Sequence, residues 1–367
     1  MLFLLFICFA SALLSNAMLV RFGRKHVYHY SLNLPQRFHS GHVPRLGGLG
    51  MMVACTVGWV WMAFSETLHL PNQIRIGAWT AFCLWSVAMV TVAGGVYEDL
   101  TQRLHARWRL VLTVGAAALA VGLLDLSIPR LGIPGVDAIW VMAPWAGIVL
   151  ALLAVAGLPH AFNLIDGYNG LAGIVALICC LALAYVALQV GDRQLAAIVL
   201  VLAGSTAGFL AWNYPRGLIF AGDGGAYLWG VVIAIANILL VLRHPLVSPW
   251  FPVLLLIYPV WETLFSIYRK AARGQSPGVA DALHFHQLIY RRIVRGVFHD
   301  DESRRMLMRN NRTSPYLWGF TVLTVMPAVL FWYNTPVLMA FTALFVISYL
   351  WAYFSIVRFK VPSWLRR

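Results

Sequence analysis

Eleven stretches of mostly apolar residues run through this chain and constrain its fold more than any other feature. A helix needs ~20 such residues to cross the hydrocarbon core of a bilayer. Only 11% of the 367 residues are charged and 61% are hydrophobic, whereas soluble domains are about 25% charged and about 45–50% apolar. The sequence therefore predicts an all-α, polytopic membrane protein. The predicted spans are 1–20, 46–65, 77–97, 108–125, 139–160, 171–190, 195–212, 225–242, 250–268, 316–333 and 336–357.

Basic residues sort into alternate loops between these spans. If the N-terminus lies outside, 23 of the 27 Lys and Arg residues fall in inside loops. The positive-inside rule then places the C-terminus in the cytoplasm. Met1–Val20 has no positive n-region and is followed by Arg21, so we expect a retained helix rather than a cleaved signal peptide. The chain is predicted to be one integral domain, 1–367, with a larger cytoplasmic loop at 269–315. Its net charge of +14 lies in the loops, which favours this topology over nucleic-acid binding.

Four carboxylates lie at predicted cytoplasmic ends of spans: Glu98, Asp99, Asp166 and Asp223. A carboxylate at the edge of hydrocarbon is costly, so it is usually paired or functional. The adjacent Glu98 and Asp99 repel each other unless a cation lies between them, and Mg²⁺ binds through one or two carboxylates together with phosphates. A solvated helix end with Arg103 as counter-charge also explains this pair.

Two glycine-containing segments add amides to this face. Asn163, Asp166 and Asn169 recur every three residues, so they can share a face of a helix or turn. Asp223 follows Asn213 by ten residues and stands between glycines before a span, where backbone N–H groups can face an anion. Helix capping by these polar side chains is the structural alternative.

The long inside loop carries histidines followed by arginines. His284 and His286 lack the further ligands of a structural zinc site. Together with Arg291 and Arg292 they suit phosphate oxygens, although a solvated basic loop explains them too. Glu262 lies within a predicted span, which makes it either functional or a buried, hydrogen-bonded structural residue.

These segments together resemble the polyprenyl-phosphate N-acetylhexosamine-1-phosphate transferase family, which includes the enzymes that initiate O-antigen and enterobacterial common antigen synthesis. A P-loop is absent from the sequence. The motifs that carry the resemblance, in order, are His39-x-Gly41-x-x-Pro44-x-x-Gly47-Gly48, Glu98-Asp99, Asn163–Ala172, Asn213 with Asp223, and His284-x-His286. The chain departs from the family where Glu98 and Asn169 replace the usual aspartates and where Gln287 replaces a further histidine.

The resemblance implies that a polyprenyl phosphate attacks the β-phosphorus of a UDP-N-acetylhexosamine, releasing UMP. Mg²⁺ is the implied cofactor, with Mn²⁺ as a substitute, and Asp223 is its expected ligand. Asp99, assisted by Glu98, is expected to face the lipid phosphate as its base or as electrostatic support. The expected catalytic residues are Glu98, Asp99 and Asp223, and the expected substrate-binding residues are Asn163, Asp166, Asn169, Asn213, His284, His286, Arg291 and Arg292.

The expected partners are the UDP-sugar, undecaprenyl phosphate and the lipid bilayer, without nucleic acid; a homodimer stays open. The expected location is the bacterial inner membrane, with the site on the cytoplasmic face and a role in O-antigen or related polysaccharide synthesis. A phospho-N-acetylmuramoyl-pentapeptide transferase is the alternative within the family. A transporter is less favoured because it would show repeats and midplane charges, and a purely structural protein would not need four polar helix ends.

One span is predicted to bend. Pro259 lies well inside 250–268 and removes a helical hydrogen bond, so we expect a kink near Tyr258. A bent helix leaves a gap beside its neighbours, and the resemblance implies a groove there for the lipid chain, leading towards Asp99. A kink filled by Trp261 or Phe265 is the alternative.

Overall fold

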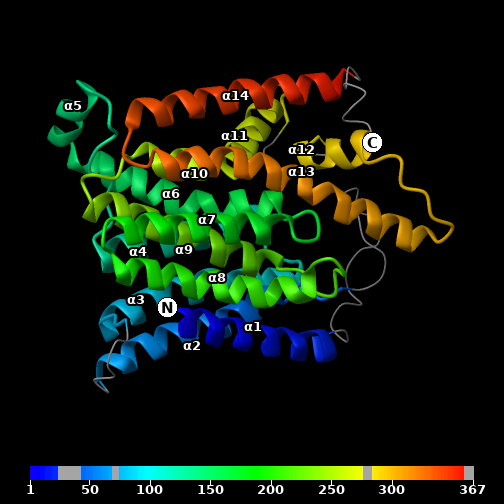
Figure 1. The fold of residues 1–367 in the computed structure, drawn as a ribbon, viewed down its shortest axis with the longest axis horizontal. Coiled ribbons are helices and arrows are strands. Elements are labelled where there is room, and N and C mark those ends of the chain that lie inside the picture. The colour runs from blue at the N-terminus through cyan, green and yellow to red at the C-terminus, as the bar shows by residue number, and fades with distance from the viewer. Residues whose placement is uncertain (24–42, 68–73, 276–282, 359–367) are drawn as a thin grey trace.

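The computed structural model describes residues 1–23, 43–67, 74–275 and 283–358, and most of them lie in helices (Figure 1). The all-α prediction is confirmed. The long helices are α1 (Leu2–Phe22), α2 (Gly47–Thr67), α3 (Ala78–Thr101), α4 (Ala106–Leu124), α6 (Pro144–Ile165), α7 (Leu171–Gln189), α8 (Arg193–Asn213), α9 (Gly222–Arg243), α13 (Glu302–Leu330) and α14 (Thr335–Val357). The shorter ones are α5 (Val136–Met142), α10 (Trp250–Leu255), α11 (Ile257–Ala271) and α12 (Phe285–Leu288), followed by a π-helical turn at Ile289–Ile293.

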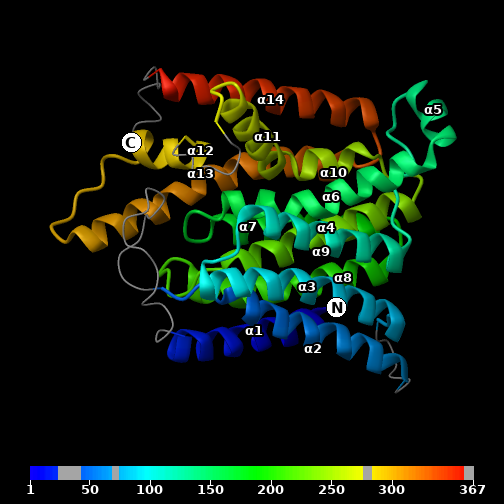
Figure 2. The same cartoon turned by 180° about the vertical axis from the view of Figure 1, so that it is seen from behind.

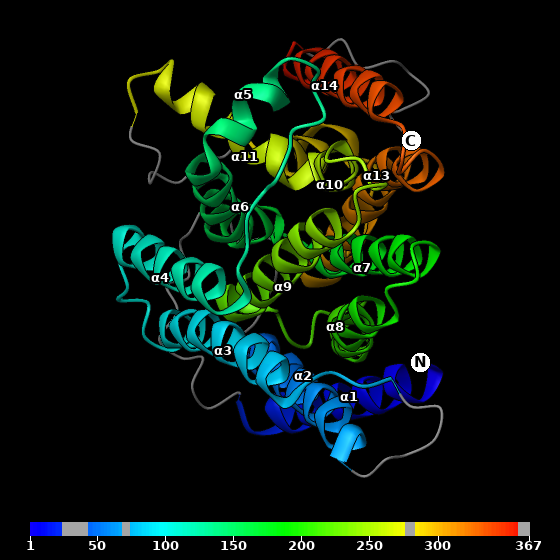
Figure 3. The ribbon, with the colours of Figure 1, turned by 90° about the vertical axis from the view of Figure 1, so that its left-hand side faces the viewer.

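Within the described ranges, 10 helices are long and apolar enough to cross a membrane. They correspond to all the predicted spans except 250–268, and the chain is a multi-pass membrane protein. Helix α9 forms the centre of the bundle, where 94% of its most apolar window is buried, while α1 and α14 bury only 22% of theirs. Figure 3 shows α9 surrounded by other helices, with α1 and α14 at opposite edges. The exposed apolar side chains of the outer helices are therefore those that lipid would cover.

The predicted span 250–268 is broken near Tyr258, as expected: the helix is interrupted at Leu256, between α10 and α11. Pro259 has no N–H, and its ring crowds the carbonyl four residues earlier, that of Leu255. The helix therefore breaks one turn before the proline, and helical hydrogen bonds continue on either side. Figure 2 shows α11 steeply inclined to α10. The lipid groove that this bend suggested stays a prediction.

The segment 269–315, predicted as one large loop, is largely helical where it is described. Helix α11 continues to Ala271, α12 and the π-helical turn follow the undescribed residues, and α13 begins at Glu302 and runs for 29 residues. The Asp301 carboxylate accepts two backbone N–H groups at the start of α13, which satisfies donors that a helix leaves unpaired. The first turns of α13 extend beyond one end of the bundle (Figure 1).

The carboxylate-bearing helix ends meet at that same end. The ends of α3, α6 and α8 and the start of α9 lie together in Figure 2. Glycines allow this approach: a Cβ atom on Gly48 would lie 2.1 Å from the Gly225 nitrogen, and one on Gly95 would lie 2.4 Å from the Gly224 nitrogen. Because no larger residue fits at these contacts, the glycine pairs bring α2 and α3 against the first turn of α9.

Candidate active site

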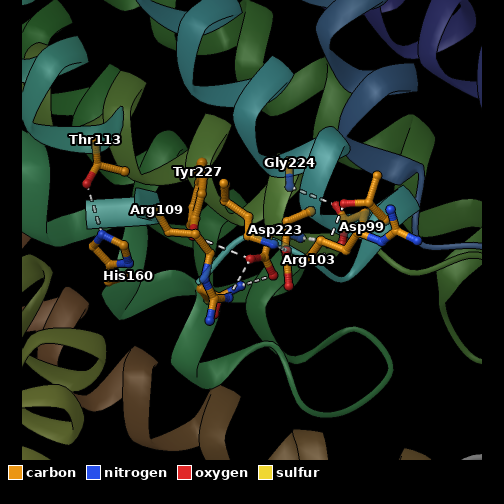
Figure 4. Close-up of polar contacts among 12 residues, drawn as sticks. Asp99, Arg103, Arg109, Thr113, His160, Asp223, Gly224 and Tyr227 are labelled. Carbon is orange, nitrogen blue, oxygen red and sulfur yellow. Dashed lines mark hydrogen bonds and ion pairs between the residues drawn. The ribbon is translucent and has the colours of Figure 1, made fainter. Parts of the chain in front are cut away.

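Asp223, in the first turn of α9, is the centre of a polar network (Figure 4). Its Oδ1 accepts a hydrogen bond from the Asn163 amide at 2.7 Å. Its Oδ2 forms an ion pair with Arg109 of α4 at 2.9 Å and accepts a longer hydrogen bond from the Tyr227 hydroxyl at 3.4 Å. Three helices that are separate in sequence thus contribute to one carboxylate. The network joins Asp223 to Asn163 as predicted, and adds two residues that the sequence analysis did not identify.

Asp99 lies beside this network and accepts hydrogen bonds from the backbone at the start of α9. It is 3% exposed, and its two oxygens accept the N–H groups of Asp223 at 3.0 Å and of Gly224 at 3.1 Å. Both N–H groups lie in the first turn of α9, where a helix leaves its backbone donors unpaired. Asp99 of α3 supplies their acceptors, and its negative charge interacts favourably with the dipole of α9. Asp99 thus lies next to Asp223, while its predicted action on the lipid phosphate stays a prediction.

Glu98, next to Asp99 in the sequence, contacts the loop that precedes α4. Its Oε2 accepts the backbone N–H of Leu104 at 2.7 Å, which ties the end of α3 to the loop before α4. Arg103 was considered as the counter-charge for the acidic pair, but the ion pair found in this cluster joins Arg109 to Asp223. Glu98 is half-buried, so it retains contact with solvent at the edge of the site.

Asp166 ends α6, three residues after Asn163, and is also half-buried. Burial raises the pKa of Asp166 to about 7, while Arg45 lowers it and Asp223 raises it by smaller amounts. The opposing effects place Asp166 within electrostatic reach of both residues. Asp166 and Asn163 thus lie at the same end of α6, near Asp223, and their role in substrate binding stays a prediction.

Asn169 and Asn213 make structural contacts in the same loop region. The Asn213 side chain accepts the Gly170 N–H at 2.6 Å and donates to the Ile219 carbonyl at 2.8 Å, which locks the α6–α7 loop to the α8–α9 loop. The Asn169 amide donates to Asn311 Oδ1 at 3.0 Å. Their contribution to substrate binding stays a prediction.

The Asn169 amide also donates to a second oxygen. This is the Pro215 carbonyl, at 3.4 Å, which the Asn311 amide reaches too at 2.7 Å. The backbone of Asn169 is held by α13 as well, because its N–H donates to Asn310 and its carbonyl accepts the Ser314 hydroxyl. Asn169 thus connects the α6–α7 loop to α13. Its side chain contacts the oxygens of Asn311 and Pro215, so this position needs a hydrogen-bond donor.

The histidines lie close to the α6–α7 loop. His284 and His286 stack with ring centroids 5.4 Å apart, and a Cβ atom on Gly167 would lie 3.2 Å from His286 Nε2. Burial lowers the pKa of His286 to about 3, with His284 adding to the shift and Glu262 opposing it. His286 is therefore a neutral imidazole next to the loop that carries Asp166.

The arginines that follow are partly used within the fold. Arg292 donates to the carbonyls of Ile356 and Val357, both at 2.6 Å, at the end of α14. Arg291 is half-exposed, and its carbonyl accepts the Arg295 side chain. Their predicted role in phosphate binding is untested by these contacts. In the motif ahead of α2, His39 and Gly41 lie outside the described residues.

Sequence reasoning missed Arg109, Tyr227 and, behind them, a polar pair between Thr113 Oγ1 and His160 Nε2 at 2.9 Å (Figure 4). The His160 ring also meets the Tyr227 ring edge-on at 5.5 Å. All four lie inside or at the ends of apolar spans. Polar residues are rare in such spans, and that rarity alone could have marked these four as candidates for function. Arg109 was used only in the count of basic residues that predicted the topology.

The chemistry of this site favours phosphate groups and a hard cation. Carboxylate oxygens are the ligands that Mg²⁺ prefers, and Arg109 supplies a planar donor suited to phosphate oxygens. No three His, Cys, Asp or Glu side chains form a metal-binding group among the residues that the structure describes. A magnesium ion held here would therefore take part of its ligand set from a bound phosphate or water.

The part of the chain that carries this site is similar to known proteins. Residues 79–241 match the family model described as glycosyl transferase family 4. The chain is 28% identical over 252 residues to a "probable undecaprenyl-phosphate N-acetylglucosaminyl 1-phosphate transferase" of Bacillus subtilis (strain 168), covering 68% of this chain and 66% of that protein. It thus spans just under two thirds of that relative's length.

Two further relatives cover different shares of the chain. A "decaprenyl-phosphate N-acetylglucosaminephosphotransferase" of Mycobacterium leprae (strain TN) is 26% identical over 336 residues, 80% of each protein. A "phospho-N-acetylmuramoyl-pentapeptide-transferase" of Synechococcus sp. (strain JA-3-3Ab) is 36% identical over 168 residues, covering 42% of this chain and 46% of that protein.

Proposed function

We propose that the chain, whose residues 79–241 match the glycosyl transferase family 4 model, transfers N-acetylhexosamine-1-phosphate from a UDP-sugar to a polyprenyl phosphate. An oxygen of the polyprenyl phosphate forms a bond to the β-phosphorus of the UDP-sugar. The bond from that phosphorus to the oxygen bridging the two phosphates breaks, and UMP leaves. The product is a polyprenyl-diphospho-sugar that starts a cell-surface glycan.

The observation that carries this proposal is the network around Asp223. Phosphoryl transfer needs little covalent chemistry from a protein, so catalysis rests on positioning and on charge stabilisation. Arg109 and Asn163 both contact the Asp223 carboxylate, which places a cation, an amide and a carboxylate where a diphosphate could be held. The site also lies at a helix end, where a membrane-anchored phosphate arrives.

Asp223 is the proposed ligand of Mg²⁺, and the half-buried Asp166 stands near it. The carboxylate donors fit this ion, since Mg²⁺ is usually bound by one or two carboxylates and completes its shell with phosphates and water. When bound, the ion offsets the negative charge of the diphosphate. Arg109 would then donate to a phosphate oxygen, and Asn163 would orient the carboxylate.

The excess of basic residues at this end of the bundle supports a cytoplasmic site in a bacterial inner membrane. In the reaction implied by the family, the UDP-sugar comes from the cytoplasm. The sugar donor and the proposed site therefore lie on the same side of the membrane. Undecaprenyl phosphate enters from the bilayer, and the broken segment α10–α11 is the proposed boundary of its path.

The test is transfer by purified protein in mixed micelles. Undecaprenyl phosphate, Mg²⁺ and a panel of UDP-N-acetylhexosamines are supplied, and the lipid product and UMP are measured together. Stoichiometric formation of both supports the proposal. Hydrolysis of the UDP-sugar without lipid product, or no turnover with any donor, would contradict it.

Phospho-N-acetylmuramoyl-pentapeptide transfer is the second candidate, because relatives with that name match parts of the chain. It uses the same lipid phosphate but a donor bearing a peptide. Including UDP-N-acetylmuramoyl-pentapeptide in the panel separates the two functions by the mass of the lipid product.

A further inference from the structure

A buried carboxylate lies beneath the histidine motif. Glu262 of α11 is 0% exposed, and three donors from two other elements surround it. The Tyr349 hydroxyl of α14 donates to Oε2 at 2.5 Å, while the backbone N–H of Phe285 and Nδ1 of His284 reach Oε1 at 3.0 and 3.2 Å. Helices α11, α12 and α14 therefore meet at one side chain.

These partners determine which nitrogen of His284 carries a proton. An ionised carboxylate only accepts hydrogen bonds, and a buried charge is tolerated when donors satisfy it. With Glu262 ionised, His284 Nδ1 must be the donor, and Nε2 is left as the nitrogen that can meet another group. Stacking on His286, with the two rings inclined by only 8°, further restricts rotation of the ring.

The stacked rings connect Glu262 to the proposed site. His286 meets Tyr168 edge-on at 5.5 Å and lies against Gly167, next to Asp166. The two stacked imidazoles thus form a continuous series of contacts between Glu262 and the α6–α7 loop.

We propose that Glu262 is a positioning residue that, held by Tyr349, keeps the Nδ1 proton of His284 and so directs Nε2 towards a substrate phosphate. The proposal rests on the transferase function proposed above. Phosphate oxygens accept hydrogen bonds, so this contact requires Nε2 to donate as well, and the Glu262 carboxylate would balance the charge of a ring that donates from both nitrogens. The last helix of the bundle is then part of the support of the site.

Three variants separate positioning from general packing. Glu262→Gln keeps the size of the side chain but removes its charge, and Tyr349→Phe removes one of its three donors. Tyr353→Phe is the matched control, because the Tyr353 hydroxyl holds the Leu283 carbonyl of the same loop from the same helix at 3.3 Å without a hydrogen bond to Glu262. Turnover, KM for both substrates and the thermal unfolding midpoint are measured for each.

We expect Glu262→Gln to lower kcat by about 10- to 100-fold, the range found when the hydrogen-bond partner of a metal-bound histidine is removed. Tyr349→Phe should lower kcat less, and Tyr353→Phe should remain close to the wild type, with all three proteins folded. Wild-type turnover in Glu262→Gln would overturn the proposal. An equal loss of kcat in Tyr349→Phe and Tyr353→Phe would also overturn it, because equal losses would report only the packing of α14 against the rest of the protein.

Nitrogen NMR of histidine-labelled protein in liposomes tests the contact without any activity. The His284 signal is identified by subtracting the spectrum of His284→Gln. We expect a protonated Nδ1 throughout the pH range in which the protein is folded, and a bare Nδ1 with a protonated Nε2 would overturn the assignment. If the wild type transfers no sugar phosphate at all, the proposed function fails while this measurement still decides the role of Glu262.

Discussion

Asp99→Asn distinguishes a supporting role of Asp99 from a direct role in the reaction. In the wild type, the two carboxylate oxygens accept the N–H groups of Asp223 and Gly224. An asparagine offers one oxygen and one NH₂ group, so one of the two N–H donors loses its acceptor in a site that is 3% exposed. The start of α9 should then loosen, and Asp223 with it.

The expected loss can be worked from these contacts. A hydrogen bond to a charged group contributes about 1.5–3 kcal/mol net, and a negative charge at a helix N-terminus contributes about 0.3–1 kcal/mol. Asp99→Asn should therefore lower the free energy of unfolding by about 2–4 kcal/mol, as measured by reversible unfolding in mixed micelles. Glu98→Gln is the matched control, because its amide oxygen still accepts the Leu104 N–H, and it should change stability by less than about 1 kcal/mol.

Turnover completes the experiment. If Asp99 holds α9 in place, Asp99→Asn loses stability and activity together, and part of the activity returns at lower temperature. An unchanged free energy of unfolding would refute the capping argument. A stable but inactive Asp99→Asn protein would instead favour the direct action on the lipid phosphate that the sequence predicts.

The other predictions concern the same end of the bundle. Asp223→Asn should abolish turnover at every Mg²⁺ concentration while the protein stays folded, and near-normal activity would remove Asp223 as metal ligand. Arg109→Lys should lose part of the activity and Arg109→Met more, with the larger effect on the KM for UDP-sugar; equal effects on both substrates would argue against phosphate binding by Arg109. Because the folded form of Asp166, with its pKa of about 7, keeps a proton that the unfolded chain releases, the free energy of unfolding should fall as pH rises from about 4 to about 7. Asp166→Asn should lack this slope when unfolding is followed across that range, and an unchanged slope would contradict the raised pKa. Asn169→Asp should destabilise the protein by about 1–3 kcal/mol, because a carboxylate would face the oxygens of Asn311 and Pro215; unfolding in detergent measures this, and a more stable variant would refute it.

The sequence by itself determined the class of fold and the location of the polar chemistry. Spans of ~20 apolar residues can satisfy their backbone only as helices in lipid, so helices and most of their limits followed from composition and length. Asn163, Asp166 and Asp223 were identified because carboxylates and amides are rare at helix ends in an apolar chain. Pro259 likewise predicted a break, since the missing N–H is a property of the residue itself, and the helix is interrupted at Leu256.

Only the tertiary structure decided which of these side chains act together. Arg109 lies 114 residues from Asp223 and Tyr349 lies 87 from Glu262, and no local pattern predicts such pairs because they depend on how helices pack. The same packing turned Asp99 towards backbone donors. Sequence fixes what each helix end can donate or accept, whereas the close approach of α2, α3 and α9 through glycines decides which partner it meets.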